Sequence, residues 1–326
     1  MSTSETTAPT PAIDALGQAA KVHQINSWED FERVYDQWFR RKRGRWYFRG
    51  QRDACWPLRT TLERLLDPIR GRVVNAEPYP RYASGSVASS VGARIELLIL
   101  RAFQARASKF ISNLPQADET LEWLALMRHW GLPARLLDVS TSPYVALYFA
   151  LCDLLQCNKT PDTLAAVWAI NHVPLRATGS LQADVFAHTD LSGPDLFNEH
   201  FVGEDRKAFA APVHPRTHNE RLAAQQGTFL CIADVDLSFG DNVTKHMPVN
   251  ELSGMSLVHR LEIARGAATE FLERLSSMNI HSASLFPDLQ GYTRFIEQCL
   301  LLFGAGDRQQ EPHLDFESFE RLGWLG

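Results

Sequence analysis

The sequence has little of what marks secreted or membrane proteins. Its 326 residues include only five cysteines, an odd number, and no two of them form a CxxC pair. No apolar run approaches the roughly 18 residues that a membrane-spanning helix needs. The first residues, MSTSETTAPTPA, lack the basic and apolar regions of a secretory signal. We therefore expect a reduced, soluble cytoplasmic protein that does not contact a membrane.

The common catalytic signatures are also missing. The sequence contains no GxGxxG, no GxxxxGK[ST], no HExxH and no GxSxG. These absences remove the main support for Rossmann, P-loop, zinc-protease and α/β-hydrolase assignments, and we expect no metal ion. A net charge of −5 argues against a protein that coats nucleic acid with a generally basic surface.

What is present is an ordinary globular composition, with 45% hydrophobic and 22% charged residues. The Ser, Thr, Ala and Pro of residues 1–24 predict a disordered tail, and residues 25–326 predict a single globular domain. Within this domain, residues 66–90 and 172–218 are expected to be long loops. Helical and strand patterns interleave, which predicts an α+β fold with a helical N-terminal subdomain.

The hydrophobic periodicity locates the elements of this fold. Helices are predicted near residues 27–42, 93–111, 119–131, 141–156, 267–279 and 292–304. Strands are predicted near residues 45–50, 164–170, 227–236 and 256–264, and residues 134–140 are either a strand or an extended turn.

The stretch RWYFRGQ contains the first candidate site residue, Arg49, which is followed by Gly50. A guanidinium presents a rigid fork of donors that matches carboxylate and phosphate groups. Arg49 therefore either holds a ligand or pairs with a structural carboxylate such as Asp138. The basic run at residues 40–45 has two interpretations as well, a phosphate contact or the solvated end of a helix.

A second cluster of polar residues follows at residues 128–150. His129 and Arg135 stand near the end of a predicted helix, and Asp138 ends an apolar run. The STSP sequence at residues 140–143 is typical of a helix N-cap. Free N–H groups and hydroxyls at a helix start can also bind a phosphate or a ribose, so both interpretations stay open.

A third cluster places Glu220, Gln225 and Gln226 before Gly227 and a predicted strand. A carboxylate or amide at this point can hydrogen-bond sugar hydroxyls. The alternative is a surface ion pair between Glu220 and Arg221.

Taken together, these clusters resemble the FRG domain family. The resemblance rests on Phe-Arg-Gly at residues 48–50, HWGLPARLLD at 129–138 with Tyr-Phe-Ala at 148–150, Arg221 with Gln225, Gly227 and Phe229, and LFPDL at 285–289. It covers roughly residues 25–305. Trp130 and Val139 depart from the tyrosine and the aromatic residue that are usual in the family.

A weaker resemblance to ADP-ribosyltransferases carries a functional implication. In that superfamily a strand ends in Arg-Gly or His-Gly, a serine-threonine-serine block follows, and a glutamate opens a later strand. The resemblance implies a mixed, mainly antiparallel sheet and NAD as substrate. It implies catalytic roles for Ser140, Thr141 and either Glu220 or Gln225. The residues that we expect to bind NAD are Arg49, Gly50, His129, Arg135, Ser142 and Tyr148.

These resemblances lead to two functional hypotheses. The first is a bacterial toxin or phage-defence effector that transfers ADP-ribose from NAD to a protein or RNA acceptor, or hydrolyses NAD, with a possible cognate partner that neutralises it. The second is a non-catalytic nucleotide- or RNA-binding module of a stress or defence complex. Aromatic residues beside the basic run motivate the second hypothesis, because aromatics stack bases while Lys and Arg contact phosphates.

Overall fold

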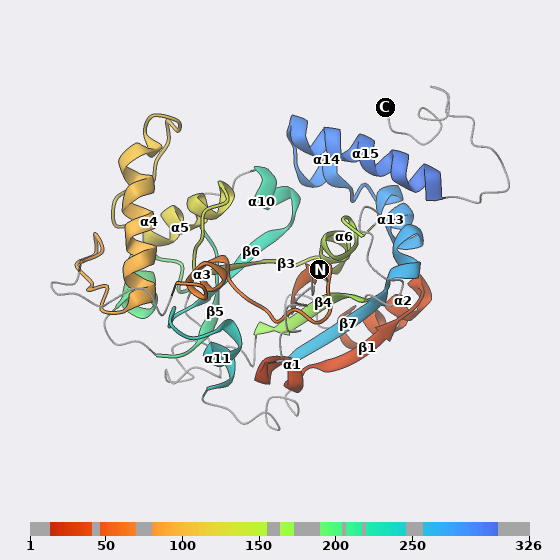
Figure 1. Cartoon of the computed structure of the whole chain (residues 1–326), viewed down its shortest axis with the longest axis horizontal. Helices are drawn as coiled ribbons and strands as arrows, with labels where there is room; N and C mark the ends of the chain where they lie inside the picture. Colours follow the sequence, from red (N-terminus) through yellow and green to blue (C-terminus); the bar gives the residue numbers. More distant parts are fainter. Residues whose placement is uncertain are drawn as a thin grey trace, which may run out of the picture.

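A mixed sheet organises the fold in the computed structural model (Figure 1). The model describes residues 14–40, 46–69, 80–154, 164–172, 190–203, 207–216, 220–245 and 257–305. Across these residues seven strands follow the order β1-β7-β4-β2-β3-β6-β5. Only β1 and β7 are parallel, and every other neighbouring pair is antiparallel. The strands are β1 (Lys21–Ile25), β2 (Trp46–Gln51), β3 (Leu136–Ser140), β4 (Leu164–Asn171), β5 (Ala210–Val213), β6 (Gly227–Ile232) and β7 (Val258–Ala264).

Helices cover both faces of this sheet, and none in the described residues is long and apolar enough to cross a membrane. In the first half of the chain they are α1 (Ala15–Ala19), α2 (Trp28–Trp38), α3 (Thr61–Leu66), α4 (Val91–Ala107), α5 (Thr120–His129) and α6 (Pro143–Leu151). In the second half they are α9 (Pro194–Phe197), the π-helix η3 (Asn198–Val202), α10 (Glu220–Ala224), α11 (Phe239–Thr244), the 3-10 helix η4 (Arg265–Ala267), α13 (Ala268–Ser277), α14 (Ser282–Leu285) and α15 (Leu289–Ala305).

The sheet is split between β2 and β3. β2 pairs with β4 along all six of its residues, and β3 pairs with β6 along all five of its own. Between β2 and β3, however, a single pair is formed, Phe48 with Ser140. The sheet therefore consists of two halves, β1-β7-β4-β2 and β3-β6-β5, which diverge on one side of that pair.

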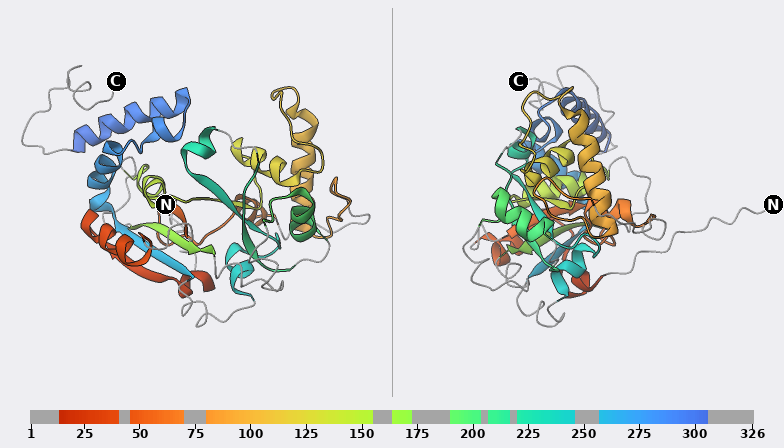
Figure 2. Two further views of the ribbon diagram at one scale, coloured as in Figure 1. Left: turned by 180° about the vertical axis from the view of Figure 1, so that it is seen from behind. Right: turned by 90° about the vertical axis from the view of Figure 1, so that its left-hand side faces the viewer.

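Each half carries its own helical layer. On the first half, α2, α6 and α13 pack over β2, β4 and β7 around an aromatic core that includes Trp28, Phe31 and Phe271. On the second half, α3, α4, α5 and α9 pack against β3, β5 and β6. The opposite face of the sheet is covered by α1 and α11. The two layers stand apart in Figure 1 and in the left view of Figure 2.

Local sequence signals account for several of these elements. Ser27 caps α2, with its hydroxyl accepting from the Asp30 N–H, and Ser142 caps α6 ahead of Pro143. Gly131 takes a positive φ of 82° just after α5, the conformation that glycine adopts most easily at a helix end. The predicted helices and strands are all present, with β3 as a strand and most ends shorter than expected.

Three expectations about the chain organisation need correction. Residues 14–24 of the predicted tail contain α1 and most of β1, because β1 pairs with the distant β7; residues 1–13 lie outside the described part. For the same reason β1 belongs to the main sheet, so the N-terminal segment is no separate helical subdomain. The predicted loop at 172–218 contains α9, η3 and β5, because β5 is stabilised by pairing with β6.

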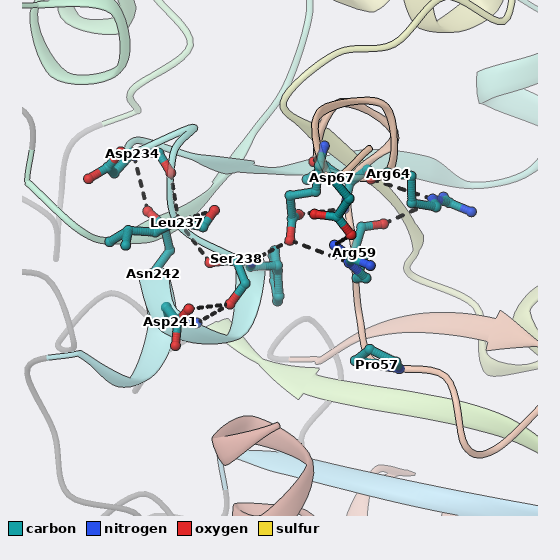
Figure 3. A network of polar contacts seen from close by, with 12 residues as sticks. Pro57, Arg59, Arg64, Asp67, Asp234, Leu237, Ser238, Asp241 and Asn242 are labelled. Atoms are coloured by element: carbon teal, nitrogen blue, oxygen red, sulfur yellow. Dashed lines mark hydrogen bonds and ion pairs between the residues drawn. The ribbon is translucent and has the colours of Figure 1, made fainter. Parts of the chain in front are cut away.

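A polar network joins α3 to α11 beside the β3-β6-β5 half of the sheet (Figure 3). The buried Glu63 carboxylate accepts from the Thr60 N–H at 2.7 Å and from the Phe239 N–H at 2.9 Å. Burial raises the pKa of Glu63, and these two N–H groups oppose that rise. Asn242 bonds to the carbonyls of Asp234 and Ser238. This network therefore links helices that pack on opposite faces of the second half.

Candidate functional site

A cavity of about 300 Å³ lies where the two halves of the sheet diverge. This volume is at the lower end of the range for small-molecule sites. The ends of β2, β3 and β6 form one side, and α5, α6 and α10 contribute the remaining walls. The split in the sheet therefore creates a hollow between two packed layers.

Arg49 extends from β2 across the split. Its Nη1 donates to the main-chain carbonyl of Asp138 at 2.6 Å and lies 3.8 Å from the Asp138 carboxylate. The guanidinium thus connects β2 to β3 where their ladder is interrupted. Its Nε is buried and has no hydrogen-bond partner among the residues that the structure describes. The contact with Asp138 predicted as one of the two interpretations is therefore present, and Arg49 also lines the cavity, where ligand binding stays a prediction.

Gly50 is required by the packing of α6 on β2. A Cβ atom at this position would overlap the carbonyl oxygen of Ala146 and lie 2.6 Å from the nitrogen of Ala150. Phe48 is buried in the core under the same helix. Of the Phe-Arg-Gly sequence, only the arginine therefore presents polar groups to the cavity.

The charges that line the cavity are unbalanced. Arg128, from the last turn of α5, places Nη2 2.7 Å from the Asp138 carboxylate and Nη1 3.2 Å from the Thr61 hydroxyl. Among the described residues, Arg221 of α10 is the third arginine of the lining and Asp138 is its one carboxylate. Three positive charges thus face one negative charge, which favours an anionic ligand.

The pKa values reflect this imbalance. Burial lowers the pKa of Arg49, and the Asp138 carboxylate opposes this while the positive charges of Arg64 and Arg128 add to it. Burial also lowers the pKa of Arg221, and the carboxylates of Asp138 and Asp288 oppose this shift. His129 lines the cavity as well, and its pKa is lowered by burial and by the nearby charge of Arg221. An anion in the cavity would relieve the repulsion among these groups.

The hydroxyl groups of residues 140–142 form hydrogen bonds mainly with other groups of the protein. Ser140 lines the cavity, but its hydroxyl donates to the Gln225 carbonyl at 2.8 Å and accepts from the Ser142 N–H at 3.0 Å. Ser142 caps α6 by accepting from the Val145 N–H. Thr141 donates to the Gln226 carbonyl at 3.3 Å. Neither Thr141 nor Ser142 lines the cavity, so the N-cap interpretation holds for Ser142.

Glu220 and Gln225, the two candidates for the glutamate of the superfamily resemblance, lie in different surroundings. Gln225 lines the cavity, and its side-chain NH₂ donates to the Leu285 carbonyl at 3.1 Å. Glu220 is exposed at the first residue of α10 and is not part of the lining. Of these two residues, the neutral amide of Gln225 and not the carboxylate of Glu220 therefore lines the cavity.

Two other predicted residues lie away from the cavity. Arg135 is buried under the second half, where it pairs with Glu96 and donates to the Phe201 carbonyl. Tyr148 is buried beneath α15, and its hydroxyl donates to Gln298 Oε1 at 3.0 Å. Of the predicted residues, the structure therefore brings together Arg49, Gly50, His129, Ser140 and Gln225.

Arg128 and Arg221 were not predicted as site residues. Both stand inside the sequence clusters, next to His129 and Glu220, but nothing in their spacing separates them from other surface arginines. The described residues contain no group of three or more His, Cys, Asp and Glu side chains that could hold a metal ion.

Fold and cavity together define an α+β protein with an arginine-rich site at the split of a mixed sheet. Residues 44–159 match the family model of the FRG domain, and this part of the chain is an FRG domain. The match includes Arg49, Arg128, Asp138 and Ser140, whereas Arg221 and Gln225 lie beyond it. Comparison with curated proteins and with solved structures gave no match.

Proposed function

We propose that the cavity binds NAD and that the protein acts as an ADP-ribosyltransferase-like enzyme or an NAD glycohydrolase. The observation that carries this proposal is the convergence of Arg49, Arg128 and Arg221 on a cavity with a single carboxylate. Guanidinium groups suit the diphosphate of a dinucleotide. The mixed, mainly antiparallel sheet supports the resemblance to the ADP-ribosyltransferase superfamily. The proposed role as a toxin or phage-defence effector, and the protein or RNA acceptor, come from that resemblance.

In the proposed reaction the bond between the ribose C1′ and the nicotinamide nitrogen breaks. Nicotinamide leaves with the bonding electron pair, and an acceptor nucleophile or water bonds to C1′ and releases a proton. The arginines would hold the diphosphate, and the Gln225 side chain and main-chain carbonyls would position the ribose. Positive charge develops on the ribose in the transition state. The neutral amide of Gln225 stabilises this charge less than a carboxylate would, so Gln225 would contribute more to NAD binding than to the reaction rate.

The test is incubation of the purified protein with labelled NAD, with and without cell extract. We expect nicotinamide release or a labelled macromolecule, and loss of both in Arg128→Gln. Arg33→Gln, which changes an exposed arginine of α2, is the matched control and should retain activity. Equal turnover by Arg128→Gln would contradict the proposal, and so would the absence of NAD binding by the wild-type protein.

A second candidate function is nucleotide binding without turnover. It is favoured by the neutral Gln225 and by the contact of the sole lining carboxylate, Asp138, with Arg128. Saturable NAD binding with no nicotinamide release would support it. The basic run at 40–45, on which the RNA-binding hypothesis depends, lies almost entirely outside the described residues.

A further inference from the structure

Arg221 differs from the other two cavity arginines in how it is held. Arg49 and Arg128 both contact Asp138. Arg221 forms no ion pair with any residue that the structure describes. Instead its guanidinium lies over the ring of Phe286, 4.4 Å from the ring centre. Its donors are therefore available to a ligand in the cavity.

Phe286 is itself firmly placed. Its side chain is 9% exposed and makes an edge contact with Phe149, a residue of the cavity wall, at a centroid distance of 5.9 Å. The preceding residue, Leu285, accepts the hydrogen bond from Gln225. Arg221 and Gln225 lie on successive turns and both contact residues 285–286. Figure 1 and the left view of Figure 2 accordingly show α10 between α5 and the α14–α15 pair.

We propose that Arg221 binds a phosphate group of the nucleotide directly, and that Phe286 is the residue that positions it. The inference rests on the proposed nucleotide site. In this arrangement Arg49 remains on the Asp138 carbonyl as a bridge between the two halves of the sheet. Stacking on an aromatic ring fixes the plane of a guanidinium and leaves its edge free to bond an anion. The phosphate site is thus completed by residues beyond the part of the chain that matches the FRG family.

The chain offers a matched control for Arg221. Arg294 of α15 also lies near the Phe286 ring, 5.9 Å from its centre, but it does not line the cavity. Arg221→Gln and Arg294→Gln remove the same charge from the same ring. Only the first removes a donor from the cavity.

The experiment measures binding of ADP-ribose, inorganic pyrophosphate and adenosine by calorimetry. For Arg221→Gln we expect about tenfold weaker binding of ADP-ribose and pyrophosphate, equivalent to about 1.4 kcal/mol, with adenosine binding and the melting temperature unchanged. Arg294→Gln should bind all three like the wild-type protein. Equal weakening by both variants would assign the effect to general surface charge and overturn the inference.

The positioning role of Phe286 has its own readout. Phe286→Leu should weaken pyrophosphate binding, Phe286→Tyr should retain it, and Phe286→Leu should cause no further loss when Arg221 is already glutamine. Additive losses would show that Phe286 acts independently of Arg221, which contradicts the positioning role. Because the melting temperature of Phe286→Leu can fall, the comparison is made well below the transition.

The outcomes separate this inference from the proposed enzyme function. Arg221-dependent binding of ADP-ribose without nicotinamide release from NAD would leave the inference standing and remove the enzyme. NAD turnover that Arg221→Gln leaves unchanged, in KM as well as kcat, would remove the inference and leave the enzyme. If the wild-type protein bound neither ADP-ribose nor pyrophosphate, both would fail.

Discussion

Arg135 and Arg49 are both well buried, but their surroundings shift the pKa of the two guanidinium groups in opposite directions. Nε and Nη2 of Arg135 bond to the Glu96 carboxylate, and its Nη1 donates to the Phe201 carbonyl. Burial lowers the pKa of Arg135, but the charge and hydrogen bond of Glu96 together with Tyr82 and Cys231 outweigh this effect, and the net shift is upward. At Arg49 burial prevails, the net pKa shift is downward, and Nε has no partner in the described part of the chain.

This difference separates an arginine that completes a core from one at a site. A buried charge is tolerated when its donors and its charge are satisfied, as they are for Arg135. Around Asp138, by contrast, three arginines line the cavity with this one carboxylate among the described residues. The unbalanced cluster is therefore the one to which we assign a ligand.

The largest expected effect comes from breaking the balanced pair. Glu96→Ala leaves the Arg135 charge buried without its partner, which should destabilise the fold by about 3–5 kcal/mol. Urea unfolding measures this loss. The double variant Glu96→Leu with Arg135→Met should recover much of the stability, and a loss below about 1 kcal/mol for Glu96→Ala would contradict the structural role of the pair.

The next effect tests the packing beside the cavity. Gly50→Ala places a methyl group against the main chain of α6 and should cost about 1–3 kcal/mol or more, since overpacked cores shift their backbone. Thermal unfolding measures the change. Gly266→Ala is the control, because an added Cβ there meets nothing within 4 Å. Similar melting temperatures for the two variants would show that the close approach of α6 is unimportant.

Arg49→Met should have a smaller effect, which combines a loss of stability with weaker nucleotide binding. It removes the hydrogen bond to the Asp138 carbonyl across the split, and we expect a loss of about 1–3 kcal/mol in unfolding free energy together with weaker nucleotide binding. Arg221→Gln should weaken binding alone. Unfolding and binding measured on the same samples check this contrast, and weaker binding with no loss of stability in Arg49→Met would contradict the bridging role of Arg49.

The smallest effect is a pH dependence from His129. Burial lowers its pKa below the ordinary 6.5, so the unfolded chain takes up the proton first. Its contribution to stability is complete above about pH 6.5 and is lost as the pH falls toward the folded-state pKa. Urea unfolding between pH 5.5 and 7.5 should therefore show a flatter profile for His129→Asn than for the wild-type protein. Identical profiles would contradict this assignment.

Much of the fold could be predicted from local sequence. The aromatic periodicity of α2, the Ser142 and Pro143 start of α6 and the apolar run of β4 each encode their own element within a few residues. The strand position of Arg49 and its place beside Gly50 were predicted in the same way. Such signals act through backbone geometry and hydrogen bonds between near neighbours in the chain.

What the sequence determined alone was therefore the set of elements and a list of polar candidates. Tertiary structure decided which candidates meet. It paired β1 with β7, brought Glu96 to Arg135, and placed Arg221 at the cavity of Arg49 while leaving Glu220 in solvent. These contacts join residues that are far apart in the chain, so signals between near neighbours in the sequence do not encode them.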